Sequence, residues 1–202
     1  MAEEKLQFEG VLTSIQPRIR LNRSFDESWH SYLGYALTIA SSDGSSVSVG
    51  ISEKLHEKHR LHSGMVVSLS CKAVEDPRLE SVDFYRVTGF KVLGQGEAEP
   101  ASLLPPSLAV YRERGPRRLS AKTYEGVCAS CIWGCKMAVE ITVDQWKPWI
   151  RKYRVETFCY GPKSCKHYRP GPNRKVSGRN GMVYVEEDWV DEMLTQNRGE
   201  DD

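Results

Sequence analysis

The chain has 202 residues, of which 40% are hydrophobic and 27% are charged, and it carries 28 Lys and Arg residues against 27 Asp and Glu residues. This length suffices for one large domain or two small ones, and the composition is that of an ordinary soluble protein. No apolar run approaches the roughly 18 residues that a membrane span requires, and residues 1–10 lack the basic start and apolar run of a secretory signal. We therefore expect a cytoplasmic protein with no membrane partner.

The near-neutral net charge hides two oppositely charged segments. Residues 147–179 hold ten basic residues against one acid, Glu156, whereas residues 186–202 hold eight acids against Arg198 alone. A local excess of positive charge attracts phosphate groups, and an acidic segment beside it can cover that field or bind another partner. The basic segment therefore points to a polyanionic partner that the whole-chain charge does not reveal.

The first ninety residues predict five strands and one helix. A polar loop is expected at residues 22–31, and an Asp-Gly pair predicts a tight hairpin turn at residues 41–45. Ser52 caps a predicted helix over residues 53–62, which Gly64 ends in a left-handed conformation. Strand patterns occupy residues 6–21, 32–40, 47–51, 65–74 and 84–93.

Three strands, a helix and two strands is the element order of the OB-fold. The junction at residues 61–68, Leu-His-Ser-Gly-Met-Val-Val-Ser, is similar to the helix-to-fourth-strand junction of that superfamily. The resemblance covers residues 5–93 and implies an OB-like five-stranded barrel with one short helix. An SH3-like barrel is the alternative, and the helix between strands three and four disfavours it. No residue of an OB binding motif can be transferred to this chain.

OB-folds bind oligonucleotides or oligosaccharides on the face of strands two and three and on adjoining loops. Aromatic rings and arginines fall in that region here, and they suit RNA or single-stranded DNA because bases stack on rings and guanidinium groups neutralise phosphates. Two objections stand: Tyr35 can equally be a core residue, and residues 1–93 hold eleven basic against twelve acidic residues. The candidates are Arg18, Arg20, Arg23, Tyr32 and Tyr35, with Phe25 and Trp29 on the first loop.

Two further segments precede the cysteine-rich region. His56 and His59 lie one turn apart on the predicted helix, but no cysteine or carboxylate pattern completes a metal site, so we expect a solvated helix face. Residues 94–122 are rich in Pro, Gly and Arg and are predicted to link two domains, residues 5–93 and residues 123–198.

Five of the six cysteines gather in the second predicted domain. Cys128 and Cys131 sit two residues apart in a turn, and Cys159 and Cys165 supply a second pair further along. A module of about 45 residues cannot bury enough apolar surface to fold alone, so a thiolate-bound ion would replace the missing core. Four sulfur ligands leave no open coordination position, which predicts a structural zinc ion rather than a catalytic one.

The segment between the cysteine pairs has the alternation of a β-hairpin. The two strands are predicted at residues 137–144 and 153–158, with Pro148 in the turn. Two cysteine turns joined by a hairpin resemble a zinc ribbon. The expected fold class is therefore mainly β: an OB-like barrel, a small metal-stabilised hairpin module and a C-terminal acidic helix.

Three other residues leave the ligand set open. Cys135 is as plausible a ligand as a core thiol, and Cys128, Cys131 and Cys135 with a distant fourth cysteine would suit a 4Fe-4S cluster. His167 can replace one sulfur, although beside Lys166 it is typical of a cationic surface group. Cys71 shares a strand face with apolar residues and is expected in the core. Disulfides are disfavoured in a reducing cytoplasm.

Basic residues continue past the cysteines into residues 169–181, where prolines and glycines exclude regular structure. The hairpin and this segment are predicted to contact phosphates, and three aromatic residues are predicted to stack on bases, with core packing as the alternative for the tryptophans. The phosphate candidates are Arg151, Lys152, Arg154, Lys163, Lys166, Arg169, Arg174, Lys175 and Arg179, and the ring candidates are Trp146, Trp149 and Tyr160.

The sequence after this segment predicts an acidic helix over residues 186–197. Trp189, Val190 and Met193 form its apolar stripe, which we expect to dock on the metal module. The helix is also the candidate contact for a protein partner.

No nucleophile motif, paired carboxylates or cofactor fingerprint supports an enzyme. The leading hypothesis is a nucleic-acid-binding protein, for RNA or single-stranded DNA, with a structural zinc ion. One alternative is an iron-sulfur redox protein, and another is an adaptor that recruits a protein through the acidic helix.

Overall fold

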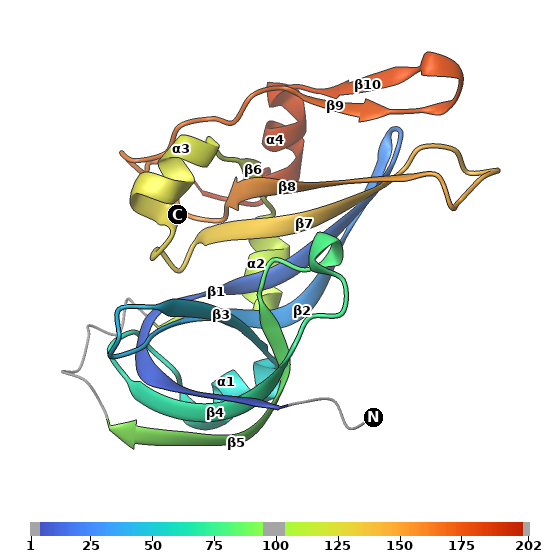
Figure 1. The fold of residues 1–202 in the computed structure, drawn as a ribbon. Helices are drawn as coiled ribbons and strands as arrows, with labels where there is room; N and C mark the ends of the chain where they lie inside the picture. Colours follow the sequence, from blue (N-terminus) through green and yellow to red (C-terminus); the bar gives the residue numbers. More distant parts are fainter. Residues whose placement is uncertain (1–4, 95–103, 200–202) are drawn as a thin grey trace.

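The computed structural model describes residues 5–94 and 104–199, and strands dominate it, as the sequence predicts (Figure 1). The strands are β1 (Leu6–Ser24), β2 (Glu27–Ala40), β3 (Ser46–Ile51), β4 (Val66–Ala73), β5 (Phe84–Gly94), β6 (Arg117–Arg118), β7 (Gly134–Thr142), β8 (Arg151–Cys159), β9 (Arg174–Ser177) and β10 (Val183–Glu186). The helices and helical turns are α1 (Glu53–His59), η1 (Pro77–Leu79), α2 (Leu108–Arg114), α3 (Ala121–Thr123), η3 (Tyr124–Cys128), η4 (Arg179–Gly181) and α4 (Asp188–Leu194).

Five strands close a ring in the order β1, β2, β3, β5, β4 and back to β1. Neighbours are antiparallel except β3 and β5, which meet in parallel at Val49 and Phe84. α1 connects β3 to β4 and lies within the outline of the ring in Figure 1. The predicted mainly β fold with a barrel-like ring of five strands and one short helix is confirmed at this level.

Apolar alternation and two close backbone contacts shape the ring. Leu37 and Ile39 on β2 are fully buried while the residues between them are only partly covered, so one strand face fills the interior. A Cβ atom on Gly10 would lie 2.2 Å from the Ala40 carbonyl oxygen. Gly34, at a φ of +124°, would bring one within 2.0 Å of the Ile51 carbonyl oxygen. Glycine therefore permits the strands to approach where the ring bends.

Strand β1 belongs to both halves of the molecule: the ring of strands β1 to β5, and the second half, which is built on the β7–β8 hairpin. Its last five residues, Arg20 to Ser24, pair in parallel with Ala138 to Thr142 of β7 while also pairing with β2. β7 continues to β8, and β8 to β6, so one sheet of eight strands joins the halves. The predicted hairpin between the cysteine pairs is confirmed, because β7 and β8 pair antiparallel along their whole length.

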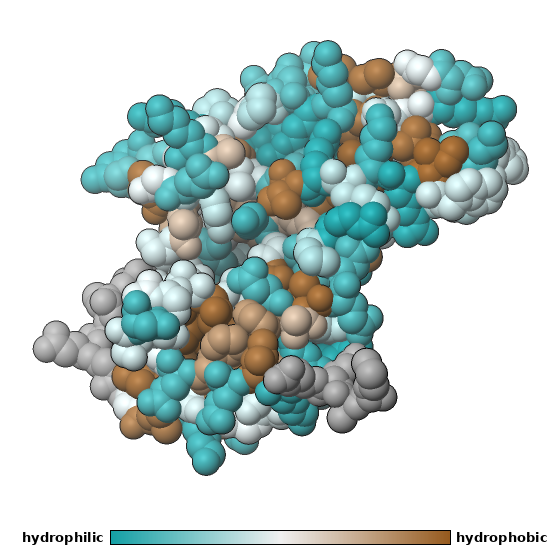
Figure 2. Space-filling model, in the orientation of Figure 1, coloured by the Kyte–Doolittle hydropathy of each residue, from teal (hydrophilic) through white to brown (hydrophobic). Residues whose placement is uncertain are grey.

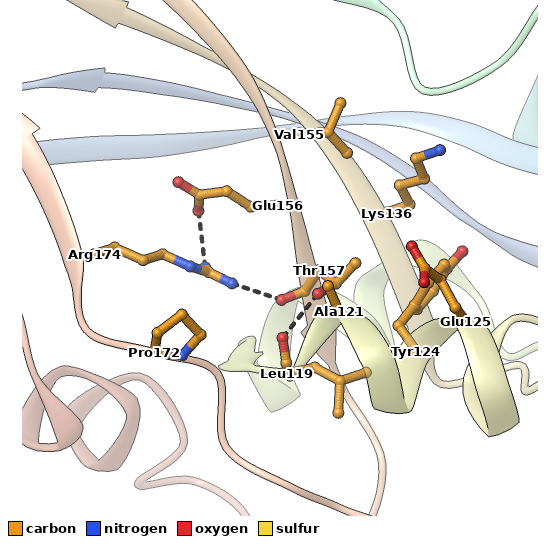
Figure 3. A pocket seen from close by; sticks show the side chains of 10 residues that line it. All are labelled: Leu119, Ala121, Tyr124, Glu125, Lys136, Val155, Glu156, Thr157, Pro172 and Arg174. Atoms are coloured by element: carbon orange, nitrogen blue, oxygen red, sulfur yellow. Dashed lines mark hydrogen bonds and ion pairs between the residues drawn. The ribbon is translucent and has the colours of Figure 1, made fainter.

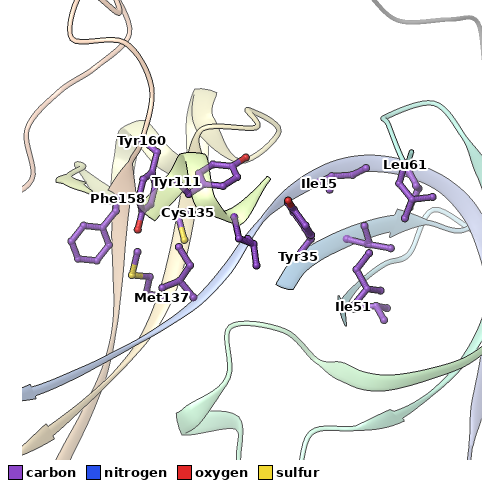
Figure 4. Packing of buried hydrophobic residues seen from close by; sticks show 14 of the residues in the cluster. Ile15, Tyr35, Ile51, Leu61, Tyr111, Cys135, Met137, Phe158 and Tyr160 are labelled. Atoms are coloured by element: carbon purple, nitrogen blue, oxygen red, sulfur yellow. The ribbon is translucent and has the colours of Figure 1, made fainter. Parts of the chain in front are cut away.

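The apolar core follows this shared strand. Ile15, Tyr35 and Leu61 on the ring side and Met137 and Phe158 on the β7–β8 side belong to one buried cluster, seen on the two sides of β1 in Figure 4. The two halves therefore share a core rather than meeting through a solvated linker.

Two boundaries in the first half differ from expectation. Residues 22–31 are paired strand rather than polar loop, with a two-residue turn in which Phe25 takes a φ of 49°. Gly64 has the expected positive φ, of 92°, but α1 ends earlier, at His59, and Arg60 is the left-handed residue that caps it. Ser52 caps the helix as predicted, because its side chain accepts a hydrogen bond from the Leu55 N–H. Cross-strand pairing overrode the polar composition of residues 22–31.

Two segments expected to be irregular carry regular structure. Part of the predicted linker, residues 95–103, lies outside the described residues, but α2 within it buries Leu108 and Tyr111 in the shared core. β9 pairs with β10 in a small antiparallel sheet. The prediction that residues 169–181 lack regular structure is therefore wrong at residues 174–177.

Two helices present different faces from those expected. His56 is only 5% exposed, and its ring lies 4.3 Å from the Tyr35 ring, so the solvated histidine face is wrong at this position. On α4, Val190 is buried, but Trp189 and Met193 are 50% and 52% exposed, so only part of the predicted stripe is docked. In the described part of the chain, no helix combines the length and apolar character needed to cross a membrane.

Candidate metal centre and nucleic-acid interface

Tight turns at one end of the β7–β8 hairpin carry four cysteines. Cys128 and Cys131 flank a turn closed by the hydrogen bond from the Cys131 N–H to the Cys128 carbonyl, 3.1 Å long. Cys159 is the last residue of β8, and the turn that follows brings Cys165 back by a 3.2 Å bond from its N–H to the Pro162 carbonyl. The hairpin register places Gly134 opposite Cys159, so both turns leave the same end of the sheet.

The four thiols are electrostatic neighbours. Burial first, and then the thiolates of Cys131, Cys159 and Cys165, raise the pKa of Cys128 to about 11. Burial is also the main cause that raises the pKa of Cys131, with Cys159 and Cys165 adding to it. Mutual repulsion of this kind is what a bound cation would reverse, because a coordinating thiol loses its proton.

Backbone groups favour the thiolate form of two of the cysteines. The Trp133 and Gly134 backbones oppose the rise of the Cys131 pKa. The Gly161 N–H donates to Cys159 Sγ at 3.3 Å. Hydrogen bonds of this kind stabilise the thiolate form, which is the form that binds metals.

The four thiols are neighbours, but they are not arranged as the ligands of one metal ion. Among residues 5–94 and 104–199, no three His, Cys, Asp or Glu side chains stand close enough together, as placed, to hold a metal ion. Charges interact over longer distances than the roughly 2.3 Å of a zinc–sulfur bond, so the two observations are compatible. The structure shows four neighbouring cysteines from two turns.

Side chains of β1 hold the Cys128–Cys131 turn, a contact that sequence reasoning missed. Gln16 Nε2 donates to the carbonyls of Cys128 and Cys131, at 2.8 Å each. Ser14 Oγ donates to the Ala129 carbonyl at 2.9 Å. Ser14 and Gln16 are buried, and buried polar groups need partners, but their burial could not be inferred from a strand that carries many other polar residues.

The two remaining cysteines belong to the main apolar core. Cys135 is fully buried in the shared core, where its thiol donates to the Pro17 carbonyl at 3.2 Å, which favours the core interpretation over the ligand one. Cys71 is buried in the ring core, as predicted. His167 is exposed on the loop after Cys165.

Several predicted nucleic-acid contacts are not at the surface. Arg23, Tyr35, Tyr160 and Arg174 are between 0% and 8% exposed. Tyr35 and Tyr160 pack in the core, and the two arginines form buried ion pairs with Glu156. These four residues are therefore not part of an exposed nucleic-acid surface.

Three further candidates are engaged by neighbours. Arg18 and Arg20 share the carboxylate of Glu80, at 2.6 and 2.7 Å. Tyr32 is partly buried, and the Arg112 guanidinium lies 4.8 Å from its ring centre. Their positive charge is partly neutralised and their rings partly covered, so this face is a weaker nucleic-acid surface than the sequence indicated.

The exposed part of the predicted interface is at the hairpin tips, by which we mean the β1–β2, β7–β8 and β9–β10 turns at residues 25–26, 143–150 and 178–182. Trp146 and Trp149, in the β7–β8 turn, are 77% and 73% exposed. A pocket of about 150 Å3 lies where this turn meets the β1–β2 and β9–β10 turns, lined among others by Phe25, Trp146 and Met182. Figure 2 shows hydrophobic groups among hydrophilic ones at this end of the molecule, at the upper right.

Most of the predicted cations lie at the tips or beside the cysteines. Lys152, Lys175 and Arg179 are exposed near the tips, where Lys152 Nζ donates to Ser177 Oγ at 3.1 Å. Arg151 pairs with Glu140, and Arg154 pairs with Glu156. The remaining exposed candidates, Lys163, Lys166 and Arg169, lie in the loop around Cys165.

Comparisons with protein-family models, with curated proteins and with solved structures find no match for this chain. The fold and the site alone therefore define its class: a mainly β protein whose barrel-like ring shares a strand with a hairpin that carries four neighbouring cysteines.

Proposed function

We propose that this protein binds RNA or single-stranded DNA through the hairpin tips and that a structural metal ion holds the cysteine turns at the other end of the same hairpin. The observation that carries the proposal is the exposure of Trp146 and Trp149, at 77% and 73%, on the turn that leads into the basic strand β8. Two tryptophans with so much apolar surface in water call for a partner, and the face of a base is one that suits them.

The charges around the rings favour a nucleic acid over an apolar partner. Lys147 lies between the two tryptophans, and Lys152, Lys175 and Arg179 are exposed on the adjoining strands and turn. Cations near exposed rings allow phosphate neutralisation and base stacking along one strand. An unpaired strand is favoured over a duplex because stacking on a side chain needs a base whose face is free.

An OB-like ring would be consistent with this activity. The closed order β1, β2, β3, β5, β4 with a helix between β3 and β4 supports the OB interpretation of the first half. Because Tyr35 is buried and Arg18 and Arg20 share Glu80, we assign the ring the role of a platform and give the tips the main contact.

A zinc ion bound by Cys128, Cys131, Cys159 and Cys165 is the metal we propose. The support is the two turns whose cysteines are electrostatic neighbours, the Gly161 N–H that donates to Cys159 Sγ, and the location of Cys135 in the core. A 4Fe-4S cluster on Cys128, Cys131 and Cys135 is disfavoured, because the Cys135 thiol bonds to the Pro17 carbonyl. Elemental analysis of protein purified without added metal tests this: stoichiometric zinc supports it, and iron with broad visible absorbance contradicts it.

A titration with a short fluorescent single strand tests the nucleic-acid proposal. We expect the logarithm of the affinity to fall steeply with the logarithm of the salt concentration. Replacing both Trp146 and Trp149 with Ala should weaken binding by about 1 to 3 kcal/mol for each ring lost. The control is Trp189→Ala, since Trp189 is 50% exposed on α4, away from the tips. Salt-insensitive binding, or a double variant that binds like the parent chain, would refute the proposal.

A protein-binding adaptor is the second candidate function, and α4 favours it. Trp189 and Met193 are half exposed on this helix, beside the exposed acids Asp188 and Glu192. An apolar and acidic helix face suits a partner with a basic groove. Pull-down from nuclease-treated extract with the parent chain and with Trp189→Ala separates the two functions, because a nucleic-acid bridge would not survive the nuclease.

A further inference from the structure

A pocket of about 430 Å3 lies on the outer side of the β7–β8 hairpin, under α3 (Figure 3). Leu119, Val155 and Pro172 supply apolar lining, and Lys136 and Glu125 face it from β7 and η3. Arg174, Glu156 and Thr157 lie on the opposite side of the view from Lys136. None of the exposed tip residues proposed to bind nucleic acid lines this pocket. Its volume falls in the range of small-molecule sites.

Beside the pocket lies a cluster of three arginines and two glutamates, all buried except Arg154, whose side chain is 33% exposed. Arg23 Nη2 is 2.7 Å from Glu186 Oε2 and 3.2 Å from Glu156 Oε2. Arg174 Nη1 is 2.8 Å from the same Glu156 oxygen, and Arg154 Nε is 2.5 Å from Oε1 of that carboxylate. Three positive and two negative charges leave a net charge of +1. Lys136 and Glu125, which face the pocket, cancel each other and leave that excess unchanged.

The cluster has more hydrogen-bond donors than acceptors. Within the described residues, four donors of the cluster have no hydrogen-bond partner, namely Arg23 Nε, Arg23 Nη1, Arg154 Nη2 and Arg174 Nη1, against one acceptor, Glu156 Oε2. Arg174 Nη1 is within ion-pair distance of Glu156, but the two groups are not oriented for a hydrogen bond. Burial lowers the pKa of Arg174 to about 10, which reflects the cost of an incompletely compensated charge. A buried cation with free N–H groups requires an explanation, and a bound anion is one.

Arg174 and Glu156 are the two members of this cluster that line the pocket. The Arg174 side chain is 8% exposed, and its Nη2 is held by the Thr157 carbonyl at 2.7 Å, so the guanidinium is fixed. Arginine forms pairs of parallel hydrogen bonds with phosphate, and Lys136 adds a second positive charge as a point donor. Apolar lining beside these groups suits the uncharged remainder of a ligand larger than the anion itself.

We propose that this pocket binds a phosphate monoester, with the phosphate toward Arg174 and Lys136 and the organic part over Val155 and Leu119. The inference does not depend on the proposed nucleic-acid binding at the tips. The phosphate can come from a free nucleotide or from the 5′ end of a strand, and both present the same chemistry to the arginine.

Calorimetry on the full chain with adenosine 5′-monophosphate, adenosine and inorganic phosphate tests the proposal. We expect saturable binding of the monophosphate, weaker binding of inorganic phosphate, and none of adenosine. Val155→Glu should weaken binding at least about tenfold, because it places a carboxylate in the lining without touching the buried cluster. Val155 is 53% exposed, so this variant should fold. The matched control is Val127→Glu, since Val127 is 49% exposed in the same half but does not line the pocket.

A second pair of variants separates this site from the tips. Lys136→Gln should weaken monophosphate binding, whereas replacing Trp146 and Trp149 with Ala should leave it unchanged. Competition by a 5′-phosphorylated strand, but not by its 5′-hydroxyl counterpart, would assign the phosphate to a strand end. Competition by neither would assign it to a free nucleotide. Absence of monophosphate binding in the millimolar range, or equal binding by the Val155→Glu and parent chains, would overturn the proposal.

Discussion

The two halves of this molecule are built on opposite kinds of interior. The ring is filled by apolar side chains such as Leu37, Ile39 and Val67, each fully buried. Of the buried Arg, Asp and Glu residues that the structure describes, all except Arg23 lie after residue 113, and Arg23 pairs with Glu156 of the second half. The ring closes on itself, whereas the second half is an extension of the sheet covered by short helices and turns.

The difference lies in how backbone groups find partners. In the ring, neighbouring strands satisfy one another, so the interior can be apolar. In the second half, arginine side chains donate hydrogen bonds to the backbone carbonyls of irregular segments. Arg198 donates to the carbonyls of Arg114 and Gly161 at 2.7 Å each, to that of Cys159 at 3.0 Å, and also to that of Gly115. Such a half should depend on charge, and on any metal, far more than the ring does.

The largest expected effect separates the halves by their dependence on metal. If zinc holds the cysteine turns, Cys159→Ser or a strong chelator should release it and remove most of the stability of the second half, by several kcal/mol. Cys135→Ala is the control, because Cys135 lies in the core and should cost about 1 to 2 kcal/mol without loss of metal. Zinc quantification and hydrogen exchange read out the result. Full metal content in Cys159→Ser would contradict the ligand assignment.

The next effect concerns the buried arginine at the base of α4. Arg118 is 1% exposed and pairs with Asp191, buried, and with Asp188, whose side chain is 83% exposed. Asp191→Ala should lower the free energy of unfolding by about 3 to 5 kcal/mol, because it leaves a buried guanidinium without its main counter-charge. Asp188→Ala should cost less than about 1 kcal/mol. Urea unfolding compares the two, and equal losses would show that burial does not decide the strength of these pairs.

A ring substitution gives the matching measurement for an apolar interior. Leu37→Ala should lower the free energy of unfolding by about 2 to 5 kcal/mol through lost burial and a cavity. Urea unfolding measures this loss on the same scale as that of Asp191→Ala. A loss below about 1 kcal/mol from Leu37→Ala would contradict an apolar, well-packed ring interior.

The smallest expected effect is a pH dependence at the seam between the halves. Burial, then the nearby Arg23 charge, lowers the pKa of His30 to about 4 from 6.5. The unfolded chain then binds the extra proton between those values, so the stabilising contribution is complete above pH 6.5 and is lost as pH falls toward 4. We expect a loss on the order of 2 kcal/mol over that interval. His30→Phe should flatten this part of the profile measured by denaturant unfolding, and an unchanged slope would exclude His30 as its source.

Sequence reasoning succeeded where a local pattern has one structural outcome. Alternation predicted the β7–β8 hairpin, and the Ser52 cap marked the start of α1. It also separated Cys71, as a core thiol, from the pairs now found near one another. These features depend on spacing and propensity within a few residues, which the chain carries wherever it folds.

The sequence did not reveal which of the charged side chains are buried. Arg23, Arg118, Arg174 and Arg198 are buried, although arginines are mostly found at surfaces. Burial of a guanidinium depends on which carboxylates and carbonyls arrive from distant parts of the chain.

The sequence by itself determined the strand pattern, the cysteine pairs and the basic hairpin, because spacing and residue type are local properties. Only the tertiary structure decided that β1 would be shared by both halves, that Trp146 and Trp149 would face solvent, and that Arg174 and Glu156 would stand at the inner side of a pocket. These outcomes depend on contacts between residues far apart in the chain, and the free energy of such contacts is set when the elements pack together.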